Sequence, residues 1–88
     1  MAAQGVIKSE LPAQNAVAVT PHNTNELTFV TRGLYVGGAG NIVVIMADDL
    51  TGAAPVTFTG VLAGTILPIA VRRVNSTNTT ATSIVALW

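Results

Sequence analysis

The chain has 88 residues, of which half are apolar, eight are charged and none is cysteine, and its formal net charge is zero. This length holds one domain with one core. Zero net charge argues against a nucleic-acid binder, which needs a basic surface to neutralise phosphates, and the lack of cysteine excludes disulfides and thiolate metal sites. Soluble domains average about 25% charged residues. We therefore expect part of this charge-poor surface to be covered by partners, as in a subunit of a larger assembly.

The first fifteen residues show no sustained hydrophobic period, and Pro12 biases Leu11 away from helix. We expect an extended N-terminal arm over residues 1–15 and a β-domain over residues 16–88. Val6, Ile7 and Leu11 are apolar residues spaced along the arm, which makes them candidates for ordering on a partner; the alternative is a tail without a role. The start of the chain lacks the apolar core of a signal peptide. No run approaches the ~18 apolar residues of a membrane helix, so we expect no membrane partner.

The first half of the β-domain predicts two short strands before a glycine-rich stretch. Residues 16–20, Ala-Val-Ala-Val-Thr, predict a short strand that ends before Pro21, and residues 22–25 predict a polar turn that contains His22. Residues 27–31 alternate in polarity and predict the next strand, with Phe29 on its core face.

Residues 31–47 are the stretch around which the domain is expected to form. Two apolar runs flank a glycine cluster, which predicts strand, turn and strand, because glycine allows the chain to reverse. Both faces of residues 42–47 are apolar, so this strand should be covered on both sides. In so small a chain, we expect the second cover to come from another subunit.

The second half of the chain adds further strands with turns between them. Residues 48–54 predict a loop, residues 55–59 alternate cleanly, and residues 75–80 form a polar loop before a last strand over residues 82–88. Residues 65–74 predict one long strand that is bulged or lies at an edge, because Pro68 lacks a ladder donor. The chain thus predicts about seven short antiparallel strands and no helical period, hence an all-β, single-domain sandwich or small barrel.

Motifs that usually carry chemistry are incomplete in this sequence. The glycine-rich residues 33–40 precede a strand and lack the helix and lysine of a phosphate-binding loop. Asp48 and Asp49 are too few to supply the six to eight oxygens of a calcium site, and His22 is a lone histidine with no marked nucleophile or acid. We therefore expect no enzyme activity, no cofactor and no metal.

Several side chains suit an interface with another subunit or with another protein. Tyr35 and Trp88 combine a large contact area with a polar group, although Trp88 is alternatively a lid on the core. Arg32 lies at a strand end, where its guanidinium can reach an acid or a row of carbonyl oxygens. Arg72 and Arg73 form a basic pair that should point to opposite faces of a strand and so stay apart.

Four stretches carry a resemblance to a known family. They are Ala-Val-Ala-Val-Thr-Pro at residues 16–21, Thr-Arg-Gly-Leu-Tyr-Val-Gly-Gly-Ala-Gly at 31–40, Leu-Pro-Ile-Ala-Val-Arg-Arg-Val at 67–74, and the tail over residues 79–88. Over residues 16–88, the chain resembles the head-spike base proteins of gene transfer agents and related tailed bacteriophages. The chain departs from the family at residues 48–55, which are longer than expected, and in its first fifteen residues.

The resemblance implies a virion structural protein on the capsid exterior, either a decoration or cement protein or a head-spike base. Its implied partners are the major capsid protein, further copies of itself as a homotrimer or homopentamer, and a spike fibre protein. A different hypothesis is a small carbohydrate-binding β module of a phage tail or spike, in which Tyr35 and Trp88 would face solvent.

Overall fold

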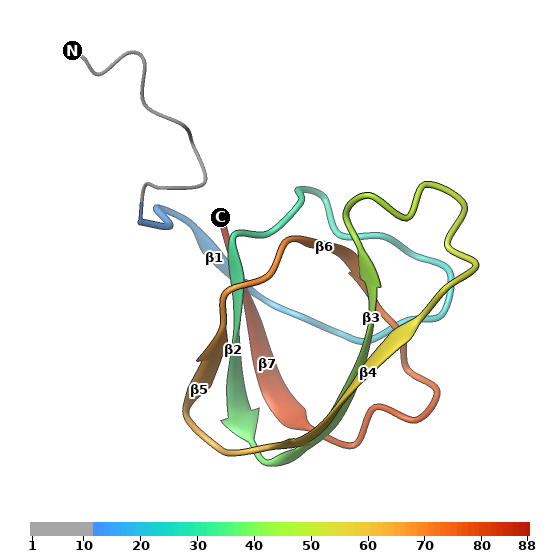
Figure 1. Cartoon of the computed structure of the whole chain (residues 1–88). Coiled ribbons are helices and arrows are strands. Elements are labelled where there is room, and N and C mark those ends of the chain that lie inside the picture. Colours follow the sequence, from blue (N-terminus) through green and yellow to red (C-terminus); the bar gives the residue numbers. More distant parts are fainter. Residues whose placement is uncertain (1–11) are drawn as a thin grey trace, which may run out of the picture.

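The computed structural model describes residues 12–88, and the arm residues Val6, Ile7 and Leu11 lie outside this part. The described residues form seven strands and no helix, which confirms the all-β fold with seven short strands (Figure 1). No helix that is long and apolar enough to cross a membrane occurs in this part of the chain. The strands are β1 (Ala16–Ala18), β2 (Gly33–Gly38), β3 (Gly40–Met46), β4 (Val56–Val61), β5 (Thr65–Leu67), β6 (Val71–Val74) and β7 (Thr82–Leu87).

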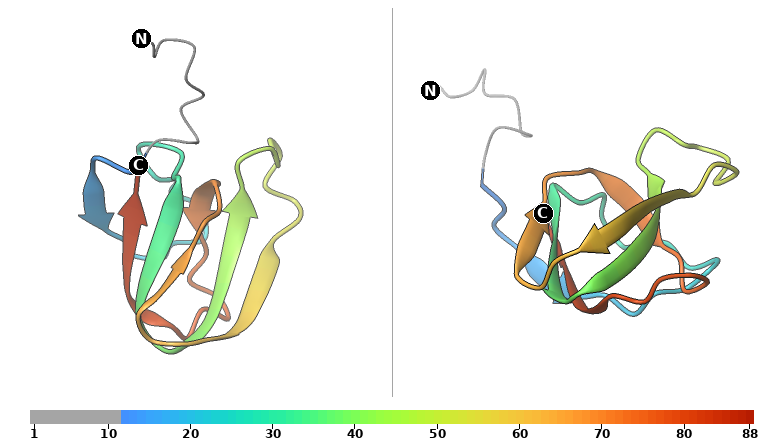
Figure 2. Two further views of the ribbon diagram at one scale, coloured as in Figure 1. Left: turned by 60° about the vertical axis from the view of Figure 1, so that its left-hand side comes forward. Right: turned by 60° about the horizontal axis from the view of Figure 1, so that its bottom comes forward.

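The strands form two antiparallel sheets that face each other. The four-stranded sheet has the order β1-β7-β2-β5, and the three-stranded sheet has the order β4-β3-β6. Figure 2 shows β1 at one edge of the four-stranded sheet and β4 on the far side of the molecule. The core lies between the sheets and consists of alternate residues of the central strands, including Leu34, Val36, Ile42, Val44, Val71 and Ile84.

Glycine moves the chain from one sheet to the other between β2 and β3. The chain reverses here as the sequence predicts, but β2 and β3 do not pair with each other. A Cβ on Gly38 would overlap the Thr82 side chain, and a Cβ on Gly40, whose φ is +156°, would lie 2.6 Å from the Ala81 amide nitrogen. Only glycine therefore lets β7 and the loop before it lie this close to the corner, the connection between β2 and β3 at residues 38–40.

Strand β3 is covered on both faces within a single chain. Val44 is fully buried on the core face, and on the other face Ile45 is fully buried and Val43 is 6% exposed. The loop after β6 lies against this strand, where the Asn75 amide donates to the Val43 carbonyl and the Val43 amide donates to Thr79 Oγ1. The expected double cover is confirmed, but the expectation that another subunit supplies it is wrong, because side chains on both faces are already buried within a single chain.

The predicted long strand over residues 65–74 is in fact two strands in different sheets. Strand β5 belongs to the four-stranded sheet and β6 to the three-stranded sheet. Pro68 has no amide hydrogen to donate, and beyond it the Ile69 amide donates back to the Leu67 carbonyl, which turns the chain out of the first sheet.

The predicted strand over residues 27–31 is absent. These residues belong to a segment that leaves the four-stranded sheet after β1, crosses to β6 of the other sheet and returns to β2. This crossing segment, residues 19–32, runs beside the free edge of β6 through bonds from the His22, Leu27 and Thr31 amides. Thr31 is 2% exposed, and its Oγ1 accepts from the Val71 amide and donates to the Ile69 carbonyl. Phe29 is predicted to lie in the core, but it is 53% exposed. The segment bonds to β6 on one side only, so its side chains do not alternate between the core and solvent as in a strand.

Candidate functional site

The charged side chains of the crossing segment and β6 hold the loop between β3 and β4. Arg72 donates to the Asp49 carbonyl oxygen at 2.9 Å and forms an ion pair with Glu26 at 2.7 Å. The Arg73 guanidinium lies next to Gly52 of the same loop and donates to Asn75 Oδ1. The prediction that Arg72 and Arg73 stay apart is therefore wrong, because the irregular pairing of β6 with β3 lets both side chains reach one loop.

Asp49 organises this loop from within. Its carboxylate accepts from the Ala54 amide at 2.9 Å, from the Gly52 amide and from Thr51 Oγ1. These bonds, that from the Ala54 amide above all, lower the pKa of Asp49 below its usual value of 3.8. The described residues contain no cluster of three or more acids and histidines that could hold a metal, so here the carboxylate stabilises the loop.

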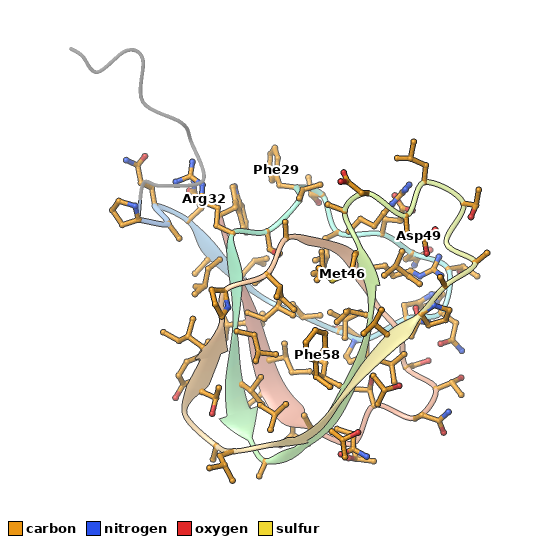
Figure 3. All side chains as sticks on the ribbon, in the orientation of Figure 1. Phe29, Arg32, Met46, Asp49 and Phe58 are labelled. Atoms are coloured by element: carbon orange, nitrogen blue, oxygen red, sulfur yellow. The ribbon has the colours of Figure 1, made fainter. Side chains whose placement is uncertain are left out.

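Two of the predicted interface residues, Arg32 and Trp88, lie near the C-terminal end of β7. Arg32 donates through Nη1 to the Pro12 carbonyl at 2.9 Å, and its amide donates to the Leu87 carbonyl. The Arg32 guanidinium therefore binds the Pro12 carbonyl oxygen, whereas the predicted partner is an acid or a row of carbonyl oxygens. Trp88 is half-buried against the core and stacks on Phe29 with ring centroids 5.2 Å apart. Figure 3 shows Arg32 and Phe29 along the same end of the molecule.

Tyr35 lies on the outer face of the four-stranded sheet, in a row of apolar residues. It pairs with Val85 on one side and with Ile66 on the other, and Val85 pairs with Ala18 of β1. Tyr35 is 38% exposed and Ile66 is 58% exposed. This row crosses all four strands and contains no charged residue, so it forms an apolar band across the outer face.

The site residues that sequence reasoning proposed do not converge on a reactive centre. His22 Nδ1 lies 3.1 Å from the Thr24 and Asn25 amides, so its ring caps the turn predicted around it. No pocket is found among residues 12–88. Tyr35 and Trp88, the two aromatic residues that the carbohydrate-binding hypothesis places in contact with solvent, both keep some exposure.

Several exposed apolar residues were not predicted as interface residues. Among them, Ile66 lies in β5 and is 58% exposed, and Leu62 directly follows β4 and is 71% exposed. A uniform stretch of small and apolar residues without charge, residues 50–71, could have drawn attention to both.

No known protein-family profile matches the sequence, and no curated protein matches it. The chain is similar to a chain in the solved structure of the capsid of a native GTA (gene transfer agent) particle, computed with C5 symmetry. The two share 34% sequence identity with a TM-score of 0.79, and the match covers 98% of this chain and 95% of that chain. The chain therefore belongs to the same protein family as this component of a gene transfer agent capsid.

Proposed function

We propose that this protein is a structural component of a virion-like particle. It is bound to the capsid exterior as a decoration protein or head-spike base and assembles there as a homo-oligomer. The observation that supports this most strongly is the similarity to a GTA capsid chain over nearly the full length of both chains. Because the match is not limited to one motif, it covers the whole fold and not a shared local element.

The described part of the chain is suited to a structural role. Its potentially reactive side chains are engaged in shaping loops: Asp49 caps one loop, Arg72 holds it, and His22 caps a turn. Interfaces between separately folded proteins are about as polar as the remaining surface. The charged loops around Asp49 and Arg72 therefore offer a surface that a capsid protein could contact without burying unpaired charge.

The N-terminal arm is our candidate for the capsid anchor. The Arg32 bond to the Pro12 carbonyl ties the arm to the β-domain at Pro12. Extended segments often bind by adding a strand to an exposed sheet edge. In an oligomer, several arms act together, so weak single contacts add up to firm attachment.

The test is binding to empty capsids made by the matching major capsid protein. We expect the full chain to cosediment with capsids at a copy number fixed by capsid symmetry, as expected for a homotrimer or homopentamer. Removal of residues 2–11, which spares the Pro12 carbonyl, should leave a folded oligomer that no longer binds.

Full occupancy by this truncated protein would move the anchor to another surface, first to the loops at residues 48–54 and 75–80. No binding by the full chain would contradict the proposed function. Binding of a spike fibre protein to decorated capsids, but not to bare ones, would distinguish a head-spike base from a plain decoration protein.

A further inference from the structure

Charge is restricted to a few places in the described part of the chain. These are Glu26 and Arg32 of the crossing segment, the pair Asp48 and Asp49, and the pair Arg72 and Arg73. Of the seven strands, β6 alone contains charged residues. The remaining strands present only apolar, small and uncharged polar side chains to their surroundings.

The distribution of charge follows the distribution of covered sheet edges. The edge strands are β1 and β5 in one sheet and β4 and β6 in the other. The crossing segment covers β6, the charged one, through bonds to its Val71, Arg72 and Val74 carbonyls. Within residues 12–88, no strand pairs with the outer edges of β1, β4 and β5. Natural proteins guard such edges with charge, and these three have none.

The uncharged edges lie on two sides of the molecule. The open side consists of the free edges of β4 and β5 with the turn between them, where Val56 is 40%, Leu62 71% and Ile66 58% exposed. The β1 side lies at the other end of the four-stranded sheet, where Val17 is 48% exposed. Figure 2 shows β1 and β4 at opposite margins of the molecule.

We propose that the open side of one copy of this chain contacts the β1 side of the next copy, with β5 pairing to β1 so that the four-stranded sheet continues from subunit to subunit. This inference rests on the homo-oligomer of the proposed function and names its contact. Strand directions fit, because β1 is antiparallel to β7, β7 to β2 and β2 to β5, which makes β1 and β5 antiparallel to each other. Rotation about an axis along the strands keeps these directions and places β5 antiparallel to β1 of the neighbour.

The side chains at the two edges are complementary in size. Ala18, Val85, Tyr35 and Ile66 form one row on the outer face. A continued sheet therefore places the exposed Ile66 on the same face as the small side chains of Ala16 and Ala18 in the neighbour, within cross-strand reach. A large residue against a small one fills space without overlap.

A second copy fits these surfaces better than a separately folded partner. Contacts within obligate oligomers resemble a core cut in half, whereas contacts with separately folded partners keep an average polarity. Because the two sides meet different surfaces, the contact is heterologous, and a rotation of the trimer or pentamer that the proposed function expects closes it into a ring. A stable contact buries about 800 Å² per partner. The two contacts of each copy then bury about a third of its accessible surface of 5187 Å². The surface can supply this area because its charged residues lie in so few places.

The test introduces one charge at each edge and then both together. Ile66→Lys and Ala18→Glu are each expected to reduce the sedimentation mass at micromolar concentration toward the 9.0 kDa of one chain. The double variant Ile66→Lys/Ala18→Glu should restore the mass, because each contact then pairs a lysine with a glutamate of the neighbour. Val30→Lys is the matched control, since Val30 is 52% exposed on the crossing segment, and its mass should equal that of the unchanged protein.

The outcomes separate this contact from the proposed function. Unchanged mass in both single variants, or a double variant that stays dissociated while its circular dichroism is native, would overturn the pairing of β5 with β1. An unchanged protein that sediments as a folded single chain would also overturn it, whether or not it binds capsids. An unchanged protein that forms rings with this charge response but ignores capsids would support the contact and overturn the proposed function.

Discussion

Thr31→Val is predicted to destabilise the fold although it preserves the shape of a buried side chain. Thr31 is 2% exposed, and its hydroxyl bridges the start of β6 by accepting from the Val71 amide at 3.0 Å and donating to the Ile69 carbonyl at 2.9 Å. Valine fills the same space but leaves both groups without a partner. An unsatisfied buried backbone group costs about 1–3 kcal/mol, and since the Ile69 carbonyl is only partly buried, we expect a total loss of about 2–3 kcal/mol.

Urea unfolding at a fixed protein concentration measures this loss directly, and the fixed concentration is needed because assembly also adds to stability. With an m-value of about 1 kcal/mol/M for a domain of this size, the midpoint should fall by about 2–3 M. Thr31→Ser keeps the hydroxyl and loses one methyl group, worth about 1 kcal/mol, so it should be the more stable variant. Thr28→Val, at an exposed position of the same segment, should change stability by less than about 0.5 kcal/mol. If Thr31→Val were as stable as Thr31→Ser, the hydroxyl bridge would not be what holds β6 to the crossing segment.

Three further predictions address the loop, the corner and the arm. Bonds from the loop lower the pKa of Asp49, so folding favours its carboxylate. The free energy of unfolding should therefore fall as the pH drops through 3.8 toward the folded pKa. Asp49→Asn should flatten this decline, whereas Asp48→Asn should keep it. Gly40→Ala should lower the free energy of unfolding, measured by thermal unfolding, by about 2 kcal/mol or more, and Gly64→Ala should lower it less. Both positions have positive φ, but only a Cβ at Gly40 meets backbone atoms. Equal losses would mean that backbone strain alone decides. Arg32→Lys should weaken assembly on capsids more than Lys8→Ala does, since an ammonium lacks the planar fork that grips carbonyl oxygens, and equal capsid occupancy of the two variants would count against a specific role for Arg32.

Much of the strand content could be predicted from the sequence because side-chain period and turn residues are local properties. The alternation at residues 55–59 and the apolar run at 42–47 both lie on observed strands, β4 and β3. The loop at residues 48–54 followed from its acids and glycine, and its inner structure then depends on Asp49. These features are determined within a few residues and need no knowledge of distant partners.

Sheet membership could not be predicted in the same way, since a period shows which residues share a face but not which strand lies alongside. Residues 65–74 keep one apolar alternation across Pro68, yet the two halves pair with different sheets. Residues 27–31 alternate like a strand, but the Thr31 hydroxyl replaces a ladder bond and Phe29 stacks on Trp88. Among the proposed site residues, Arg72 and Arg73 met at one loop because of an irregular pairing that no local pattern reports.

The position of β7 sets the order in which this protein can form during synthesis. It lies between β1 and β2, so the four-stranded sheet has no continuous centre until residues 82–87 have left the ribosome. Among strands that follow one another along the chain, β3 and β4 alone pair directly within the described part, and every other ladder joins distant segments. Such non-local pairing slows folding to the range of milliseconds to seconds. The nascent chain can therefore pair β5 with β2 early, but β1 joins the four-stranded sheet only after β7 has emerged.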